Sequence, residues 1–237
     1  MTSTIKPIKL YGGILGPNPL KIGIILTLLE LPFESVPVEF ANVKGPEYEA
    51  INPNGRLPSI HDPNTGLTIW ESGAIIEYLI ERYDDEPRKL SFTPRSAEAE
   101  LARSFLHLQT SGQGPYYGQA YWFKKYHDEK VPSAVERYVN EAKRVTGVLD
   151  KWLSKQKEAN GENLGDGPWL VGNKLSYADI AFIPWQAAAN MAFGEDGFDV
   201  AEFPHAKEWF ERMTSKETIK AVLDSATEQM TKKRAAA

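Results

Sequence analysis

The stretch NPNGRLPSIHDPNTGLTIWES, residues 52–72, decides the fold because a turn, two strands and the start of a helix follow one another within it. Residues 57–61 and 67–70 are rich in apolar and β-branched side chains and flank a turn-forming loop, which predicts a β-hairpin. Glu71 and Ser72 then open a helix. This layout offers an extended backbone edge, a carboxylate and a helix N-terminus. A small peptide with free α-amino and α-carboxyl groups would need all three.

The composition is that of a globular protein and argues against several classes. The 237 residues are 42% hydrophobic and 25% charged, with a formal net charge of −5. No basic stripe is evident, so we expect no nucleic-acid partner. No apolar run reaches a membrane span and the first residues lack the apolar core of a signal peptide, so we expect a cytoplasmic protein without a membrane partner. The absence of cysteine removes disulfides, thiolate metal sites and a cysteine nucleophile.

Motifs of other enzyme classes are missing or incomplete. The four histidines form no HExxH motif or ligand cluster, so we expect no metal site, and there is no GxSxG elbow of a serine hydrolase. The run GGILG at residues 12–16 lies between a predicted strand and a predicted helix, as nucleotide-binding loops do. Its spacing is not GxGxxG, however, and no Gly-Lys-Ser/Thr follows. We interpret it as a flexible strand-to-helix loop.

The first third of the chain alternates strands and helices. Residues 9–11 and 36–40 read as strands and residues 45–50 as a helical turn. Asn18 and Pro19 suit an N-cap and a first helical position before apolar residues at helical spacing. With the hairpin and the helix after it, the order is β-α-β, a helical link, then β-β-α. The pattern predicts a domain over residues 1–84, followed by a charged, proline-containing linker at 85–95.

Residues 96–237 read as an all-helical domain. Apolar periodicity predicts helices near residues 101–108 and over 131–157, with the run SGQGP at 111–115 as a breaker between them. Ser176 and Asp179 form a capping box, to which we assign a structural role. Pro184 lies inside the helix that follows and should kink it. A further helix is expected from Pro204 onward.

Two features of the opening stretch each allow a structural and a functional interpretation. Pro58 at a strand start is by frequency a trans proline, whereas a cis bond would turn the N–H and C=O of Leu57 outward to pair with an extended peptide. Ser72 is either a plain N-cap or part of a carboxylate-binding helix start, with Glu71 placed to hold an ammonium group. The residues alone leave both alternatives open.

Taken together, these pieces resemble the cytosolic glutathione transferases along nearly the whole chain. That family has a thioredoxin-like α/β N-terminal domain plus an all-α C-terminal domain, which is the fold that the resemblance implies. Longer strings are similar to the fungal nitrogen-regulator class, and most of them also to the bacterial nu class, known for glutathione-dependent disulfide reduction. They are GPN at 16–18, NPNGR at 52–56, WESGAI at 70–75, QTSG at 109–112, GQA at 118–120 and SAVERY at 133–138.

The resemblance implies a glutathione site in the first domain. Glu71 and Ser72 would hold the amine and carboxylate of the γ-glutamyl end. Leu57, ahead of a cis Pro58, would pair with the cysteinyl backbone. The segment Val43-Lys44 falls where the family contacts the glycine end, and the lysine suits a carboxylate.

The resemblance also implies two catalytic residues. Asn18 falls where this class places an asparagine near the sulfur. Arg137 matches a nu-class residue near bound glutathione, although a surface ion pair with Glu136 or Glu141 is the alternative interpretation. The helical domain would supply the electrophile site, and an aromatic wall is one candidate for it: Tyr116, Tyr117, Tyr121, Trp122 and Phe123.

The implied reaction is attack by the glutathione thiolate on a soft electrophile or a disulfide. Glutathione would be a co-substrate, with no further cofactor, and the expected assembly is a homodimer. A detoxification enzyme with conjugating or disulfide reductase activity is the first hypothesis. A non-catalytic glutathione-binding regulator on the same fold is the alternative. The presence of Asn18, Glu71 and Ser72, and the lack of an Asn/Gln-rich extension, favour the enzyme.

Overall fold

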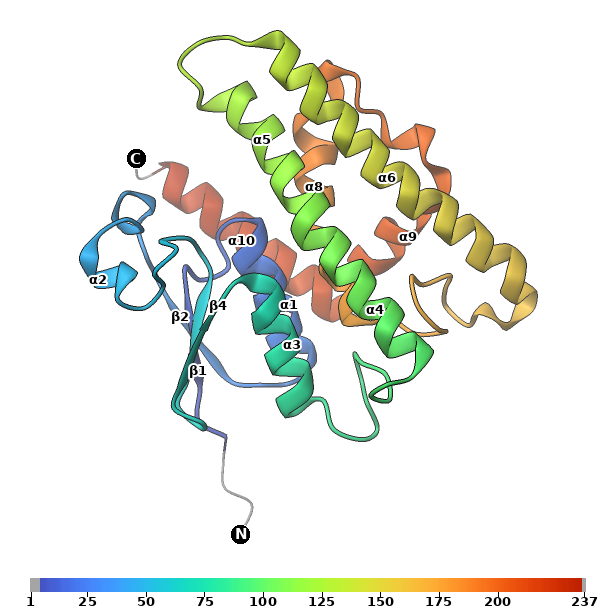
Figure 1. The fold of residues 1–237 in the computed structure, drawn as a ribbon, viewed down its shortest axis with the longest axis horizontal. Coiled ribbons are helices and arrows are strands. Elements are labelled where there is room, and N and C mark those ends of the chain that lie inside the picture. Colours follow the sequence, from blue (N-terminus) through green and yellow to red (C-terminus); the bar gives the residue numbers. More distant parts are fainter. Residues whose placement is uncertain (1–4, 236–237) are drawn as a thin grey trace. The chain divides into compact units, whose positions relative to one another are not determined.

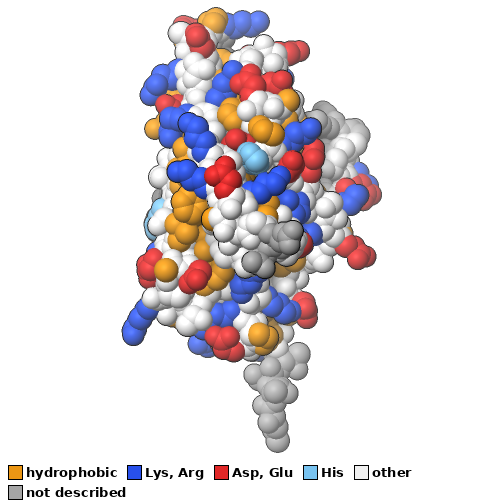
Figure 2. All heavy atoms as spheres, turned by 90° about the vertical axis from the view of Figure 1, so that its right-hand side faces the viewer, with side chains coloured by type: hydrophobic (Ala, Val, Ile, Leu, Met, Phe, Trp, Pro, Cys, Tyr) orange, Lys and Arg blue, Asp and Glu red, His pale blue; other side chains and the backbone are white. Residues whose placement is uncertain are grey.

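The computed structural model describes residues 5–235, which form two compact units. The first unit contains the residues up to Lys89 together with those from Lys216 onward, and the second contains Leu90–Ser215. Among the described residues, no helix combines the length and the apolar character needed to cross a membrane. Figure 2 shows acidic and basic side chains interspersed over the face in view.

The first unit is built on a four-stranded sheet in the order β2-β1-β3-β4 (Figure 1). Strand β1 runs parallel to β2 and antiparallel to β3, and β3 pairs antiparallel with β4 in register Ile60 to Ile69. The hairpin predicted from residues 52–72 is therefore confirmed. The elements up to the end of α3 are β1 (Ile8–Tyr11), α1 (Pro17–Leu28), β2 (Phe33–Val36), a 3-10 turn (Phe40–Asn42), α2 (Pro46–Glu49), β3 (Ser59–Asp62), β4 (Leu67–Trp70) and α3 (Ser72–Tyr83).

Helix α1 is buried from Pro19 to Leu26 on every side, as expected of a helix without a polar face. It packs against α3 and also against α10 (Glu217–Ala235), the final helix among the described residues. Ile219 and Ala226 of α10 are buried in this contact region. The sequence predicts that this C-terminal segment belongs to the helical domain. In the structure the residues from Lys216 onward group with the first unit, whereas the domain boundaries expected from the sequence stay a prediction.

The described residues of the second unit form helices joined by turns and loops, with no strand among them. Helices α5 and α6 pack together, and α6 also contacts α9 (Figure 1). The predicted fold class, an α/β unit with a four-stranded sheet plus a helical unit, is thus confirmed. The helices are α4 (Ala97–Leu108), a π-helical segment (Gln109–Gln113), α5 (Gly114–Lys125), α6 (Pro132–Asn160), α7 (Tyr177–Ile180), α8 (Ile183–Ala192) and α9 (Pro204–Thr214), with 3-10 turns at Gly161–Leu164, Gly194–Asp196 and Val200–Glu202.

Three local predictions are wrong, each for an identifiable reason. The run at 111–115 does not break the chain, because a π-helical segment continues it and Pro115 falls in the first turn of α5, where no N–H partner is needed. Strand β2 covers 33–36 instead of 36–40, because those residues pair with β1 and Pro37 follows them. Pro184 does not kink one helix but opens α8, separate from α7.

Candidate functional site

The junction between β4 and α3 carries an unusual backbone conformation. Glu71 has φ of +68°, a region that L-residues other than Asn and Asp seldom adopt, and it precedes the first helical residue, Ser72. Ser72 is therefore not the N-cap that the sequence suggests. No described side chain caps α3, so the N–H groups of its first turn point out of the helix as donors for an anion. Ser72 itself is buried, at 8% exposure.

The Leu57-Pro58 peptide bond is cis, as the family resemblance implies. The carbonyl before it is fixed from two directions: the oxygen of Arg56 accepts a hydrogen bond from Asn52 Nδ2 at 2.6 Å and another from Tyr48 Oη at 3.0 Å. The Leu57 side chain packs on Gly12, where a Cβ would stand 2.9 Å from Leu57 Cδ1. The hydrogen bonds to the Arg56 carbonyl and the packing of the Leu57 side chain on Gly12 together hold the backbone of residue 57 in one place.

Residues 52–56 connect the segments that the sequence assigns to glutathione. Asn54 Nδ2 donates to Glu71 Oε1 at 2.8 Å, and the Asn54 carbonyl accepts from Lys44 Nζ at 2.7 Å. Val43 is 7% exposed, and its carbonyl oxygen lies 2.7 Å from the position that a Cβ on Gly55 would occupy. The loop of residues 52–56 therefore contacts or adjoins the three segments that contain Lys44, Leu57 and Glu71.

Asn18 occupies a position different from the one predicted. Helix α1 begins at Pro17 and is preceded by Gly16 with φ of +92°, so Asn18 lies within the first turn and is not the cap residue. The glycine adopts this conformation without the strain that a side chain would cause. Asn18 thus stays at the helix N-terminus, where the macrodipole favours negative charge.

Lys21, one turn further along α1, is a residue that sequence reasoning missed. It is 1% exposed, and burial lowers the pKa of its ammonium group from 10.5 to about 7, against the opposing effect of the negative charge on Glu71. A signal was present: a lysine stands among the apolar residues at 20–26.

Arg137 lies on α6 in the second unit. Its side chain is 68% exposed, and Nη1 stands 3.8 Å from Glu141 Oε1. Glu141 Oε2 also accepts a 2.7 Å hydrogen bond from Arg144. The surface ion pair that was the alternative interpretation of Arg137 is thus present.

The predicted aromatic wall divides into core and surface residues. Tyr117 is fully buried and donates to the Ala142 carbonyl at 3.0 Å, so it belongs to the helical core. Phe123 and Tyr138 stack with ring centroids 5.8 Å apart, and Tyr138 also lies 6.3 Å from the ring of Tyr116. Trp122 is 46% exposed. An aromatic cluster thus exists on α5 and α6, and it includes Tyr138, which the sequence did not single out for this role.

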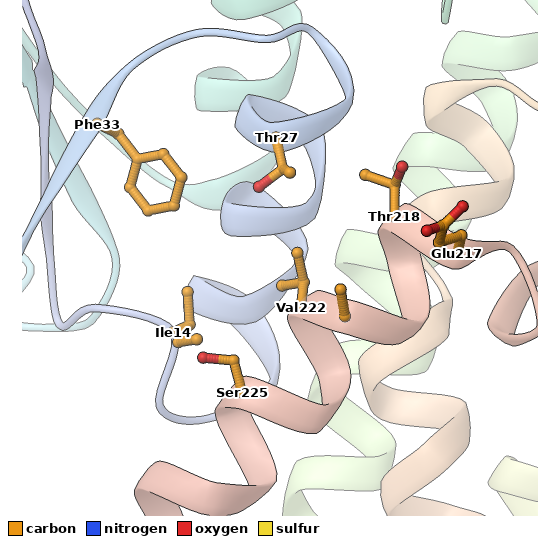
Figure 3. Close-up of a pocket in the computed structure, with 8 residues that line it drawn as sticks. Ile14, Thr27, Phe33, Glu217, Thr218, Val222 and Ser225 are labelled. Carbon is orange, nitrogen blue, oxygen red and sulfur yellow. The ribbon is translucent and has the colours of Figure 1, made fainter.

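Two pockets lie outside the segments assigned to glutathione. One, of about 460 Å³, is formed within the first unit by side chains of α1, β2 and α10, including Thr27, Phe33 and Val222 (Figure 3). The other, of about 410 Å³, lies within the second unit and is lined by Phe123, Val135 and neighbouring residues. Neither contains Asn18, Lys44, Leu57 or Glu71, so neither is the candidate site.

The chemistry of the first-unit site suits a small zwitterionic peptide. It combines a carboxylate on Glu71, a hydroxyl and uncapped helix start at Ser72, a backbone segment held by cis Pro58 and a cation on Lys44. Within the described residues, no group of three or more His, Asp or Glu side chains could hold a metal ion. The chain has no thiol of its own, so a sulfur nucleophile would have to arrive with the ligand.

Comparisons with known proteins agree with this geometry. Residues 6–81 match the family described as glutathione S-transferase, N-terminal domain, and residues 117–226 match its C-terminal counterpart. The glutathione S-transferase-like protein gedE of Aspergillus terreus is 55% identical over 94% of this chain and 97% of its own length. Glutathione S-transferase 2 of Schizosaccharomyces pombe is 39% identical over 91% of this chain and 94% of its own.

A solved structure extends the likeness to three dimensions. The glutathione transferase URE2P6 from Phanerochaete chrysosporium, in complex with oxidized glutathione, superposes with a TM-score of 0.85 at 42% identity, over 94% of this chain and 97% of the other. Both family matches, the curated relatives and this structure agree along nearly the full length. The chain belongs to the glutathione S-transferase family, with Ure2p-type transferases among its structural neighbours.

Proposed function

We propose that this protein is a catalytically active glutathione transferase that activates the glutathione thiolate for attack on an electrophile. The observation that carries the proposal is the first-unit site, in which cis Pro58, the α3 start at Glu71 and the Lys44 segment are joined by one loop. A tripeptide with one ammonium and two carboxylate groups matches these features in kind and number. The sulfur of its central residue would complete the nucleophile that the chain lacks.

Each end of glutathione has a proposed partner. Glu71 holds the α-ammonium group and Ser72, with the N–H groups of the α3 start, holds the adjoining carboxylate. The backbone of Leu57 pairs with the cysteinyl residue as an added strand would. Lys44, beside Val43, receives the glycine carboxylate. With these contacts made, we expect the cysteinyl sulfur to lie toward the start of α1.

Asn18 and the α1 N-terminus would stabilise the thiolate. Lowering the pKa of a thiol from about 8.5 to about 6.5 requires about 2.7 kcal/mol. A helix N-terminus contributes about 0.3–2 kcal/mol, and a hydrogen bond from the Asn18 amide to the charged sulfur about 1.5–3 kcal/mol. The two together reach the required value. No tyrosine or serine proton acceptor is needed for the step.

The first candidate reaction is conjugation of glutathione to an electrophile. The thiolate forms a carbon–sulfur bond to the electrophile. In a substitution the electron pair of the broken bond departs with the leaving group, and in an addition to a double bond the pair ends on a carbanion that takes up a proton. For the second candidate, disulfide reduction, the thiolate attacks one sulfur and the other leaves as thiolate. This candidate is favoured by the similar transferase URE2P6, whose structure contains oxidized glutathione. Arg137 would then bind the second, anionic glutathione moiety.

Two assays test the proposal. Conjugation of a chloronitrobenzene is followed spectrophotometrically, and reduction of a glutathione mixed disulfide is followed through the oxidized glutathione that it releases. We expect Asn18→Ala to raise the apparent pKa of kcat/KM and lower turnover, with little effect on glutathione affinity. Arg137→Ala should depress disulfide reduction more than conjugation. Glutathione binding without turnover in either assay would identify a regulator instead of an enzyme.

The setting of this activity is also a proposal. We place it in the cytoplasm, where the glutathione pool is kept reduced. A homodimer is the expected assembly, and a protective role against reactive electrophiles follows from the conjugating activity. Leu67 and Trp70 on edge strand β4 are 51% and 39% exposed, and apolar side chains of this kind on an edge strand suit a partner surface.

A further inference from the structure

We propose that Asn54 is a positioning residue that aims the Glu71 carboxylate at the amine of glutathione and links the two ends of the glutathione site. This inference rests on the proposed function, because it gives Asn54 a role only if Glu71 binds the ligand. Asn54 is not expected to touch glutathione. Its contribution passes through the side chain of Glu71 and the ammonium group of Lys44.

The first observation is the hydrogen bond between Asn54 and Glu71. The amide nitrogen Nδ2 donates to Glu71 Oε1 at 2.8 Å, across 17 residues of sequence. A carboxylate on an exposed, flexible glutamate would otherwise sample several rotamers. One oxygen fixed by an amide leaves the other, Oε2, to face an incoming ammonium group. Preorganisation of this kind improves affinity because less side-chain entropy is lost on binding.

The second observation concerns the opposite end of the site. The carbonyl oxygen of Asn54 accepts a 2.7 Å hydrogen bond from Lys44 Nζ. A carbonyl satisfies only part of the bonding capacity of an ammonium group, which has three donors. The lysine is thereby held near the loop and still has donors for a carboxylate. A single residue therefore holds both the anion and the cation that would bind the two charged ends of the ligand.

The third observation is that the loop holding Asn54 is itself fixed. Its backbone N–H donates to Asn52 Oδ1 at 2.9 Å, and Asn52 is 1% exposed. The next residue, Gly55, has φ of +57°, and a Cβ there would stand 2.7 Å from the Val43 carbonyl. Only glycine allows this close approach without displacement. Asn54 is thus a side chain on a rigid support, which a positioning role requires.

These contacts separate a positioning role from a purely structural one. In Asn54→Ala the backbone bonds to Asn52 and Lys44 remain, and only the amide bond to Glu71 is lost. A residue needed only for the turn would lower the melting temperature and leave ligand discrimination unchanged. A positioning residue would leave the melting temperature nearly as it is and weaken the binding of ligands that carry the amine.

The experiment measures dissociation constants by calorimetry for two ligands. One is glutathione, and the other is its desamino analogue, in which a glutaryl group replaces the γ-glutamyl group. We expect Asn54→Ala and Asn54→Leu to raise the Kd for glutathione about three- to tenfold and to leave the Kd for the desamino analogue unchanged. In kinetics the loss should fall on KM for glutathione, with kcat at saturation retained.

The control variant is Asn64→Ala in the β3–β4 loop. Asn64 is also an asparagine in an exposed loop. Its side-chain amide donates to the Lys6 carbonyl and to Asp62 and accepts from the Lys6 N–H, and neither partner belongs to the glutathione site. Its Kd values should match those of the parent protein. A second test uses the background Glu71→Gln, in which adding Asn54→Ala should have no further effect on the Kd for glutathione.

The outcomes distinguish the two proposals. If Glu71→Gln weakens glutathione binding and Asn54→Ala does not, the positioning role is wrong and the site assignment stands. Equal weakening of both ligands by Asn54→Ala also overturns the positioning role, because the effect would not pass through the amine. If the parent protein does not bind glutathione, or Glu71→Gln has no effect, the proposed function itself fails.

Discussion

At the scale of single residues, Lys21 is the clearest consequence of burial. Its ammonium group lies within α1 at 1% exposure, and its pKa is lowered from 10.5 to about 7 by burial. Between about pH 7 and pH 10.5, Lys21 carries a proton in the unfolded chain and has lost it in the folded protein. Stability should therefore rise with pH across this window, by up to about 1.4 kcal/mol per pH unit, and should be insensitive to this group below pH 7.

The variant Lys21→Met isolates this contribution. We expect urea denaturation between pH 7.5 and 9.5 to show a more positive slope of unfolding free energy against pH for the parent protein than for the variant. Methionine keeps most of the buried volume and cannot titrate. Parallel slopes for the two proteins would mean that Lys21 keeps an ordinary pKa in the folded state.

Glu71 and Ser72 provide the direct test of the ligand site. Glu71→Gln removes the charge that pairs with an ammonium group, and Ser72→Ala removes a hydroxyl at the α3 start. Each should weaken glutathione binding by about 1–3 kcal/mol, as expected for a lost hydrogen bond to a charged group. Glu81→Gln, a change of the same kind on the exposed side of α3, should have no effect. Calorimetric affinities equal to the parent value for both site variants would refute the assignment.

At the scale of elements, α7 depends on one carboxylate. Asp179 is fully buried and accepts hydrogen bonds through Oδ1 from Leu170 N and Trp209 Nε1, both at 2.9 Å, and through Oδ2 from the Ser176 N–H and hydroxyl. Burial raises the pKa of this carboxyl group in spite of these donors. The capping box predicted from the sequence is therefore present, and it also ties α7 to α9 and to the segment before it.

Asp179→Ala should therefore lower the unfolding free energy by more than the loss of a helix cap alone would. The indole N–H of Trp209 and the Leu170 N–H would remain buried without acceptors, so we expect a loss of roughly 3 kcal/mol or more in unfolding free energy. Thermal and chemical denaturation measure it directly. An unchanged melting temperature combined with lost activity would show that Asp179 acts in the site and not in folding.

The sequence predicts the elements well where one local pattern determines them. The turn-rich loop at 62–66 marks the hairpin, apolar periodicity of 3.6 marks α6, and a capping box is readable from two residues. The boundaries that failed depend on non-local partners. Strand β2 is set by its pairing with β1, and Ser72 lost its cap position to Glu71, whose positive φ depends on the surrounding fold.

The candidate site could be predicted in part, for a related reason. Glu71, Ser72 and Pro58 lie within a single stretch, so a motif can identify them. The role of Asn54 arises from bonds to residues 10 and 17 positions away, and the burial of Lys21 arises from packing of α1 on several sides. No pattern along the chain encodes these distances.

At the scale of the whole molecule, we expect two copies of the chain to associate. Strand β4 offers exposed apolar side chains at the sheet edge, which suit a partner surface. Light scattering at micromolar concentration should give twice the monomer mass of 26.5 kDa. A mass near that of the monomer would exclude the dimer. If the protein is a monomer, Leu67→Lys on the exposed edge should leave the mass measured by light scattering unchanged.

The packing of α10 against α1 has a consequence for the order in which the protein can mature. Synthesis runs from the N-terminus, so α10 leaves the ribosome after all the helices α4 to α9. Until then the side of α1 that α10 covers has no partner, although all residues up to 89 have long been made. The α/β unit thus matures only after the helical unit is fully translated. A nascent chain arrested at Ser215 should bind a hydrophobic dye and be cleaved within α1, whereas the released chain should resist both.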